Sequence, residues 1–163
     1  MQPQAKRARL ELDLSIDDPG SVQWLSYAGV MAIAFGTKVS DGFVGLAITM
    51  GPQFTVGWAR GGDAGAGAGT GGAMASIGAF PALGRFAGRF ALEIDCGASA
   101  GDPACVQVYQ GPDPLLASCL KLPPDLSASP TALAAAIGEM AGGFGNTGSV
   151  APRFDDVTFD VGY

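Results

Sequence analysis

Residues 7 to 16 read Arg-Ala-Arg-Leu-Glu-Leu-Asp-Leu-Ser-Ile, and polar and apolar side chains alternate through the whole stretch. Because successive side chains of a β-strand point to opposite faces of the sheet, this alternation predicts a strand with one buried face. The strand is followed by Asp17, Asp18, Pro19 and Gly20, which favour a turn. The start of the chain therefore indicates a β-strand and a reversal.

The same period of two recurs along the chain. Further strands are expected at residues 23 to 27, 30 to 35, 43 to 50, 53 to 58, 89 to 95, 105 to 110, 115 to 121 and 153 to 161. One short helical turn is expected at residues 131 to 136, an alanine-rich segment after Pro130 that ends before Gly138. Short strands without long helices predict an all-β fold, a two-layer antiparallel β-sandwich with the first and last strands side by side.

The length of 163 residues suits a single domain over the whole chain. Alanine and glycine supply 27 and 26 residues, so large apolar side chains are scarce. Residues 1 to 7 are expected to be a flexible N-terminal segment. Residues 61 to 72, almost all glycine and alanine, are expected to be a surface loop, because they offer little apolar surface to bury.

Charge and composition exclude several classes of function. The net charge is −6, and the only basic cluster is Lys6, Arg7 and Arg9, which disfavours nucleic-acid binding. Histidine is absent, which removes the commonest general base and zinc ligand. The longest apolar run, residues 27 to 35, is far shorter than the roughly 20 residues of a membrane-spanning helix. No membrane-spanning segment is predicted.

The three cysteines are Cys96, Cys105 and Cys119, and their spacing does not match a zinc ligand set. A disulfide between Cys96 and Cys105 would close the loop between two expected strands. Cys105 with Cys119 is the rival pairing, and three reduced thiols are the third possibility.

Several segments together resemble the concanavalin A-like lectin/glucanase superfamily. They are the pair of strands Phe90-Ala-Leu-Glu-Ile-Asp95 and Cys105-Val-Gln-Val-Tyr-Gln110, and the closing segment Arg153-Phe-Asp-Asp-Val-Thr-Phe-Asp160. The resemblance runs from about Leu10 to Val161. It implies a jelly-roll sandwich of the kind that bacterial surface and secreted proteins use, with carbohydrate as the ligand.

Glucanases of this fold carry a nucleophile and an acid/base on one strand, and Glu93 and Asp95 invite comparison with that strand. Retaining hydrolysis needs two carboxylates roughly 5 Å apart across the glycosidic bond. The residue four positions after Glu93 is Gly97, so the second carboxylate is missing. No catalytic residue is therefore predicted, and Glu93 and Asp95 are interpreted as the solvent face of a strand.

Aspartate outnumbers glutamate by 12 to 3, and two Asp-Asp pairs flank the terminal strands. If those strands are antiparallel neighbours, Asp17 and Asp18 lie at the same end as Asp155 and Asp156. Clustered carboxylate oxygens are ligands for Ca²⁺, which makes calcium the candidate cofactor. Aspartate is also an ordinary turn residue, which is the alternative interpretation.

Four aromatic residues are candidates for a platform on which a sugar ring stacks. Trp58 and Tyr109 lie in expected strands and are assigned to packing, whereas Trp24 and Tyr27 are the candidate ligand-binding residues.

These observations predict a non-catalytic binding or adhesion module with an extracellular or cell-surface location, and the resemblance implies a glycan as its partner. The chain as given carries no signal peptide. The alternatives are a glycan hydrolase of the same fold and a purely structural, self-assembling domain. Homo-oligomerisation stays open.

Overall fold

The alternating stretch at the start of the chain forms an interior strand of a sheet. In a computed structural model, which describes residues 5–17, 27–37, 42–49, 53–60, 74–79, 85–96, 103–123, 132–142 and 152–163, β1 covers Arg7–Asp17. The apolar residues of this strand, from Ala8 to Ile16, are at most 1 % exposed. The predicted half-buried strand is confirmed.

All regular structure in the described residues is β-strand. The other strands are β2 (Tyr27–Ala34), β3 (Gly42–Thr49), β4 (Gln53–Arg60), β5 (Met74–Ala79), β6 (Arg85–Asp95), β7 (Cys105–Gln110), β8 (Asp113–Pro114), β9 (Leu120–Lys121), β10 (Ala134–Gly142) and β11 (Arg153–Gly162).

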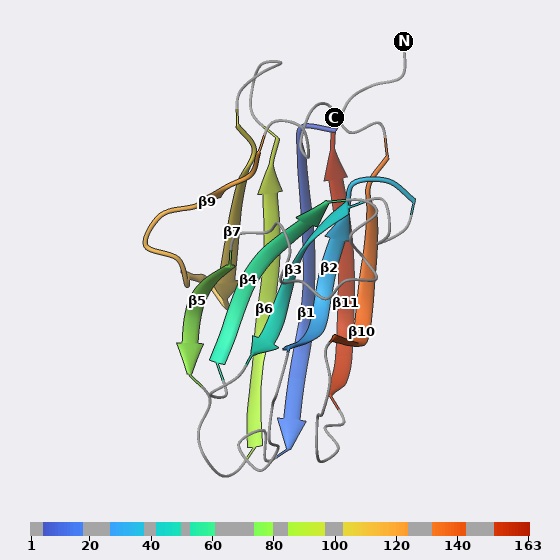
Figure 1. The fold of residues 1–163 in the computed structure, drawn as a ribbon. Coiled ribbons are helices and arrows are strands. Elements are labelled where there is room, and N and C mark those ends of the chain that lie inside the picture. The colour runs from blue at the N-terminus through green and yellow to red at the C-terminus, as the bar shows by residue number, and fades with distance from the viewer. Residues whose placement is uncertain are drawn as a thin grey trace.

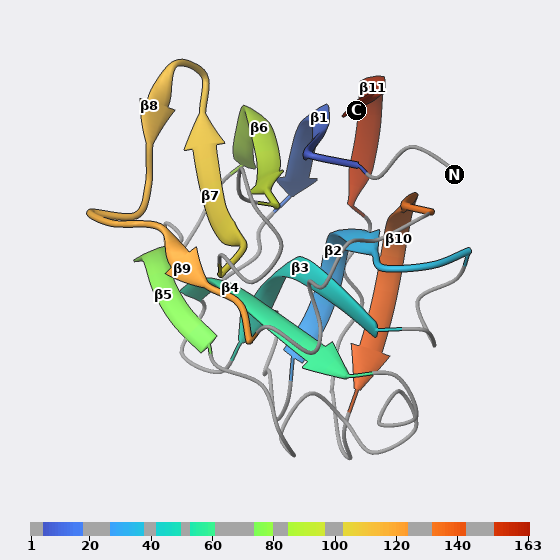
Figure 2. The same ribbon diagram turned by 90° about the horizontal axis from the view of Figure 1, so that it is seen from above.

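The strands form two antiparallel sheets. The first sheet has the order β11-β1-β6-β7-β8, with β9 also paired to β7, and the second has the order β10-β2-β3-β4-β5. Seen along the strands, the sheets lie as two layers, and β9 lies at one side between them (Figure 2). The prediction of an all-β fold built from antiparallel sheets is confirmed.

The first and last strands are neighbours, as expected. In β1, Leu10 pairs with Leu92 of β6 on one side and with Phe159 of β11 on the other. The two chain ends described therefore lie at the same end of the molecule (Figure 1).

Residues 5 and 6, which precede β1, make fixed contacts although they belong to the segment expected to be flexible. Ala5 is buried, the Lys6 backbone N–H donates to the Gly162 carbonyl at 2.8 Å, and the Cys96 N–H donates to the Lys6 carbonyl at 2.8 Å. Residues 5 to 7 are thus held between β11 and β6, which corrects the expected flexibility for these three residues.

Among the described residues, the buried apolar side chains form one hydrophobic core between the sheets. The first sheet contributes Leu10, Leu12 and Phe90, and the second contributes Met31 and Leu46, all at most 1 % exposed. Burial of these side chains is the main force that holds the two layers together.

The structure corrects the expected helical turn at residues 131 to 136. Strand β10 begins at Ala134 and pairs with β2, with Ala134 opposite Ala34 and Ile137 opposite Met31. Alanine favours a helix by local propensity, but the unpaired edge of β2 offers backbone hydrogen bonds that a single helical turn cannot match.

The expected strand at residues 115 to 121 is also shorter than predicted. The chain turns at Gly111, whose φ of 59° favours glycine, forms the two-residue strand β8, and pairs with β7 again only at β9. The expected strand residues 23 to 26 and the glycine-rich segment 61 to 72 lie outside the described residues.

Among the residues that the structure describes, no helix long and apolar enough to cross a bilayer occurs.

Candidate functional site

The polar residues of the first sheet gather on the face turned away from the core. The register of the sheet places the polar residues of β1 beside those of β6 and β11. Strand β7 adds Gln107 and Tyr109 to the same face. We call this surface the charged face. It comprises Arg7, Arg9, Glu11, Asp13, Arg89, Glu93, Asp95, Gln107, Tyr109, Arg153, Asp155, Asp156 and Asp160.

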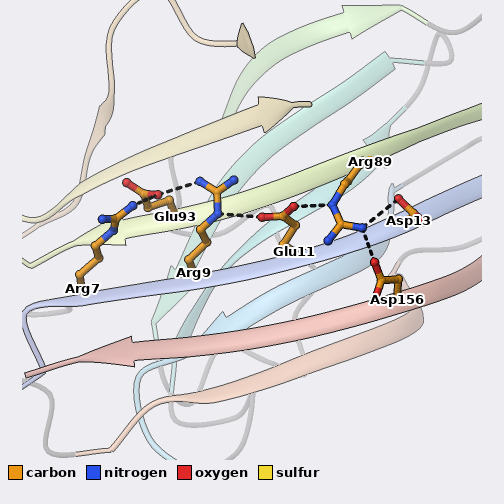
Figure 3. Close-up of polar contacts among 7 residues, drawn as sticks. All are labelled: Arg7, Arg9, Glu11, Asp13, Arg89, Glu93 and Asp156. Atoms are coloured by element: carbon orange, nitrogen blue, oxygen red, sulfur yellow. Dashed lines mark hydrogen bonds and ion pairs between the residues drawn. The ribbon is translucent and has the colours of Figure 1, made fainter. Parts of the chain in front are cut away.

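Arginines and carboxylates alternate in a row along the charged face (Figure 3). At one end, Glu93 Oε2 accepts hydrogen bonds from Arg7 Nη2 at 2.6 Å and from Arg9 Nη1 at 2.9 Å. Arg9 also donates through Nε to Glu11 Oε2 at 2.9 Å. Because Arg9 and Glu93 are direct cross-strand partners, the sheet register itself brings them together.

The row continues through Arg89 of β6. Its Nε donates to Glu11, and its Nη1 donates to Asp156 Oδ2 at 2.7 Å and lies 3.4 Å from Asp13 Oδ1. This guanidinium therefore joins β6 to β1 and β11 in one network (Figure 3).

The network sets the protonation of Glu11. Hydrogen bonds from Arg89 and Arg9 lower the pKa of the Glu11 carboxyl below its usual value, although partial burial opposes the shift. The hydrogen bonds that Arg89 donates to Glu11 and Asp156 raise the pKa of Arg89 further above its already high value. Glu11 is therefore a carboxylate at neutral pH and not a proton donor.

Arg9 also covers an aromatic ring. Its guanidinium carbon lies 5.1 Å from the centre of the Tyr109 ring, within the range of a cation–π contact. Tyr109 thus packs on the charged face, in agreement with its assignment to sheet packing. Trp58, given the same assignment, packs against the core and is only partly buried.

A hollow of about 630 Å³ lies at one end of this row, and we call it the polar depression. Strand β1 lines it with Asp13 and Ser15, β6 with Ala87 and Arg89, and β11 with Arg153 and Asp155; Leu14, Gly88 and Phe154 complete the lining. Acidic and basic residues from three paired strands therefore line the hollow. Sequence reasoning did not identify this hollow, because it depends on which strands are neighbours.

A β-bulge in β11 shapes the rim of the polar depression. The pairing between β1 and β11 shifts by one residue between Glu11 and Asp13, so that Asp156 and Val157 both lie opposite Leu12. As a result, Asp155 and Asp156 both reach the charged face although they are consecutive in sequence. The Asp156 N–H donates to Asp155 Oδ1 at 2.8 Å.

The predicted calcium ligands are placed only in part. Asp156 forms an ion pair with Arg89, Asp18 lies outside the described residues, and the side chain of Asp17 is likewise not described. The described residues contain no group of three or more carboxylates or other donors that is able to hold a metal ion. Calcium binding therefore stays a prediction.

The predicted ligand-binding aromatic residues cannot be placed on this surface. Trp24 lies outside the described residues, and Tyr27 begins β2, in the second sheet, with its side chain not described.

The second carboxylate that the sequence lacked after Glu93 has a counterpart on the neighbouring strand. Glu11 and Glu93 lie on the same face and both bind Arg9. Both carboxylates accept hydrogen bonds from arginines. Asp95 is exposed at the end of β6, as its assignment to the solvent face requires.

The disulfide differs from the favoured prediction. Cys105 is joined to Cys119, the rival pairing, and Cys96 is a free, partly buried thiol whose pKa is raised by burial. Cys105 pairs with Asp95, so its side chain is on the outer face, whereas Cys96 packs against the core on the other face. Strand β9 returns along β7 and brings Cys119 within 5.5 Å of Cys105, Cα to Cα.

No protein-family model matches the chain, and comparison with curated proteins and with solved structures likewise finds no significant similarity.

Proposed function

We propose that this chain is a non-catalytic carbohydrate-binding module, a jelly-roll sandwich of concanavalin A-like type on a surface or secreted protein, and that its ligand occupies the polar depression. The observation that carries the proposal is the lining of that hollow. The acidic residues Asp13 and Asp155 and the basic residues Arg89 and Arg153 all line one space. Strand order supports the fold assignment, because the first strand lies between the last strand and β6.

The lining offers the two kinds of hydrogen bond that a sugar needs. A hydroxyl group is both donor and acceptor, so a carboxylate can accept its proton while a guanidinium donates to its oxygen. The small residues Ser15 and Ala87 leave room for a ring between these groups. Because the groups are carried by paired strands, little conformational entropy is lost on binding.

Net charge favours a neutral glycan over an acidic one. Within the charged face, Arg7, Arg9 and Arg89 already pair with carboxylates. The face carries more aspartate and glutamate than arginine, so an acidic sugar would be repelled.

Hydrolysis is the less favoured function. A glycosidase needs a general acid whose pKa is raised, but the pKa of Glu11 is lowered by its two arginine partners.

The proposal is tested by titrating the protein with neutral hexasaccharides of glucose, mannose and N-acetylglucosamine, and with a polyuronate hexamer, by isothermal calorimetry. We expect one neutral hexasaccharide to bind and the double variant Asp13→Asn/Asp155→Asn to weaken this binding at least about tenfold. Asp160→Asn, on the same strand and face but outside the lining, is the matched control and should bind like the wild type.

Three outcomes contradict the proposal. One is that no hexasaccharide binds, and another is that the control loses as much affinity as the double variant. Release of reducing sugar by the wild type, abolished by Glu11→Gln, would instead establish the hydrolase.

A further inference from the structure

Asp156 has an unusual backbone conformation for its residue type. Its φ is 45°, and no other non-glycine residue in the described part of the chain has a positive φ. Asparagine and aspartate tolerate this left-handed region better than most residues, but they still lose free energy there compared with a β conformation. Glycine adopts it without that cost.

The contacts of Asp156 do not stabilise the folded state enough to explain its strained backbone. Its side chain is 66 % exposed, and its ion pair with Arg89 lies in solvent. Exposed ion pairs contribute little to folding, less than a strained backbone conformation typically costs. The core does not gain either, because Val157, the other residue of the bulge, is 43 % exposed.

The strained conformation of Asp156 places its carboxylate in contact with Arg89, a residue that lines the polar depression. Arg89 lines that hollow, and Asp156, which does not, holds the Arg89 Nη1 atom at 2.7 Å. The Nε atom of the same guanidinium is held by Glu11, and Asp13 lies 3.4 Å from Nη1. Asp156 is therefore the carboxylate of β11 that fixes the guanidinium from the side opposite Glu11 (Figure 3).

We infer that Asp156 is a positioning residue: the strained bulge orients its carboxylate so that the Arg89 guanidinium is immobilised at the rim of the polar depression, where it donates to the ligand. The inference rests on the proposed function and adds to it a residue that does not touch the ligand. Residues in rare backbone conformations are typically found where binding, and not stability, requires them.

The test uses two variants of the whole chain. Asp156→Gly removes both the strain and the carboxylate, and Asp156→Asn keeps tolerance of the left-handed conformation but removes the charge. We expect the melting temperature to stay equal or rise in Asp156→Gly, because glycine relieves the strain. In both variants, ¹⁵N relaxation should show that the Arg89 Nε–Hε group has become more mobile than in the wild type. The resonance of this group is assigned as the one that disappears in the variant Arg89→Lys. Affinity for the neutral hexasaccharide bound by the wild type should fall about tenfold.

Asp160→Gly and Asp160→Asn, at another exposed aspartate of β11, are the matched controls and should leave the Arg89 resonance and the affinity unchanged. The inference is overturned if the Arg89 Nε–Hε group stays rigid in both Asp156 variants, because Glu11 and Asp13 then suffice. It is also overturned if affinity is retained, or if Asp156→Gly melts at a clearly lower temperature. If the wild type binds none of the hexasaccharides, the proposed function fails separately, and the relaxation measurement alone decides whether Asp156 positions Arg89.

Discussion

Arg89 connects three strands of the first sheet through a single guanidinium group. It is a direct cross-strand partner of Asp13, reaches Glu11 further along β1, and meets Asp156 of β11 at the bulge. A planar group with several donors suits this role, and a lysine would satisfy fewer of the same carboxylates. The residue thus joins three strands of the sheet and also lines the polar depression.

The lowered pKa of Glu11 predicts how stability depends on pH. A carboxyl group whose pKa is lower in the folded state stabilises the fold above its unfolded pKa, and this contribution is lost as the pH falls through the folded pKa. The unfolding free energy of the wild type should therefore decrease below about pH 4.3. Glu11→Gln should show a smaller decrease over the same range, measured by urea unfolding at successive pH values. Equal slopes for the two proteins would contradict the shift.

Strand β1 is stabilised on both edges and on its inner face. Leu10 is fully buried and pairs with Leu92 and Phe159, so its side chain lies between two neighbouring strands at the centre of the core. Leu10→Ala should lower the unfolding free energy by about 2 to 5 kcal/mol. Val157→Ala, at a side chain that is 43 % exposed, is the control and should cost less than about 1 kcal/mol. Both are measured by denaturant unfolding, and similar losses for the two variants would contradict the assigned burial.

The segment from β7 to β9 depends on side-chain links more than on strand pairing. Gln107 Oε1 accepts a hydrogen bond from the Leu116 N–H at 3.2 Å, and its Nε2 donates to the Leu116 carbonyl at 3.2 Å. The disulfide closes a loop with a sequence separation of 14. These links hold a stretch in which β8 and β9 have two residues each.

Removal of the disulfide by Cys105→Ser/Cys119→Ser should therefore destabilise the protein by about 3 kcal/mol, as expected for a loop of this length. Cys96→Ser, at the free thiol, is the control and should have a smaller effect. Peptide mapping without reduction should identify the Cys105–Cys119 crosslink and one alkylated cysteine, Cys96. A Cys96–Cys105 crosslink would contradict the structure.

At the scale of the whole molecule, the fold depends on contacts between distant parts of the sequence. β1 pairs with β6 and with β11, which is the last strand. Such pairing has a high entropic cost of loop closure, so folding should be slow, on the scale of milliseconds to seconds.

Deletion of residues 153 to 163 should prevent cooperative folding, because β1 would lose all of its pairing on one edge and the cover from Phe154 and Phe159. Circular dichroism at increasing temperature is the measurement. A cooperative melting transition in the truncated chain close to that of the wild type would show that β11 is dispensable.

The elements that could be predicted from the sequence are those with strong alternation. Residues 7 to 16, 89 to 95 and 105 to 110 all lie in strands with their apolar side chains inward. Residues 131 to 136 were predicted wrongly because alanine carries no periodic signal, so pairing with β2 decided the outcome. The disulfide was assigned to the wrong pair for a related reason, since sequence spacing does not reveal that Cys96 and Cys105 lie on opposite faces.

The sequence by itself determined the class of fold and the inward and outward faces of its best strands, because a period of two is a property of the single strand. Only the tertiary structure decided the candidate site. The polar depression takes its residues from β1, β6 and β11, and Arg89 meets Asp156 across 67 positions in sequence. Strand order, register and one bulge bring these groups together, and each of them depends on which strands share hydrogen bonds in the folded chain.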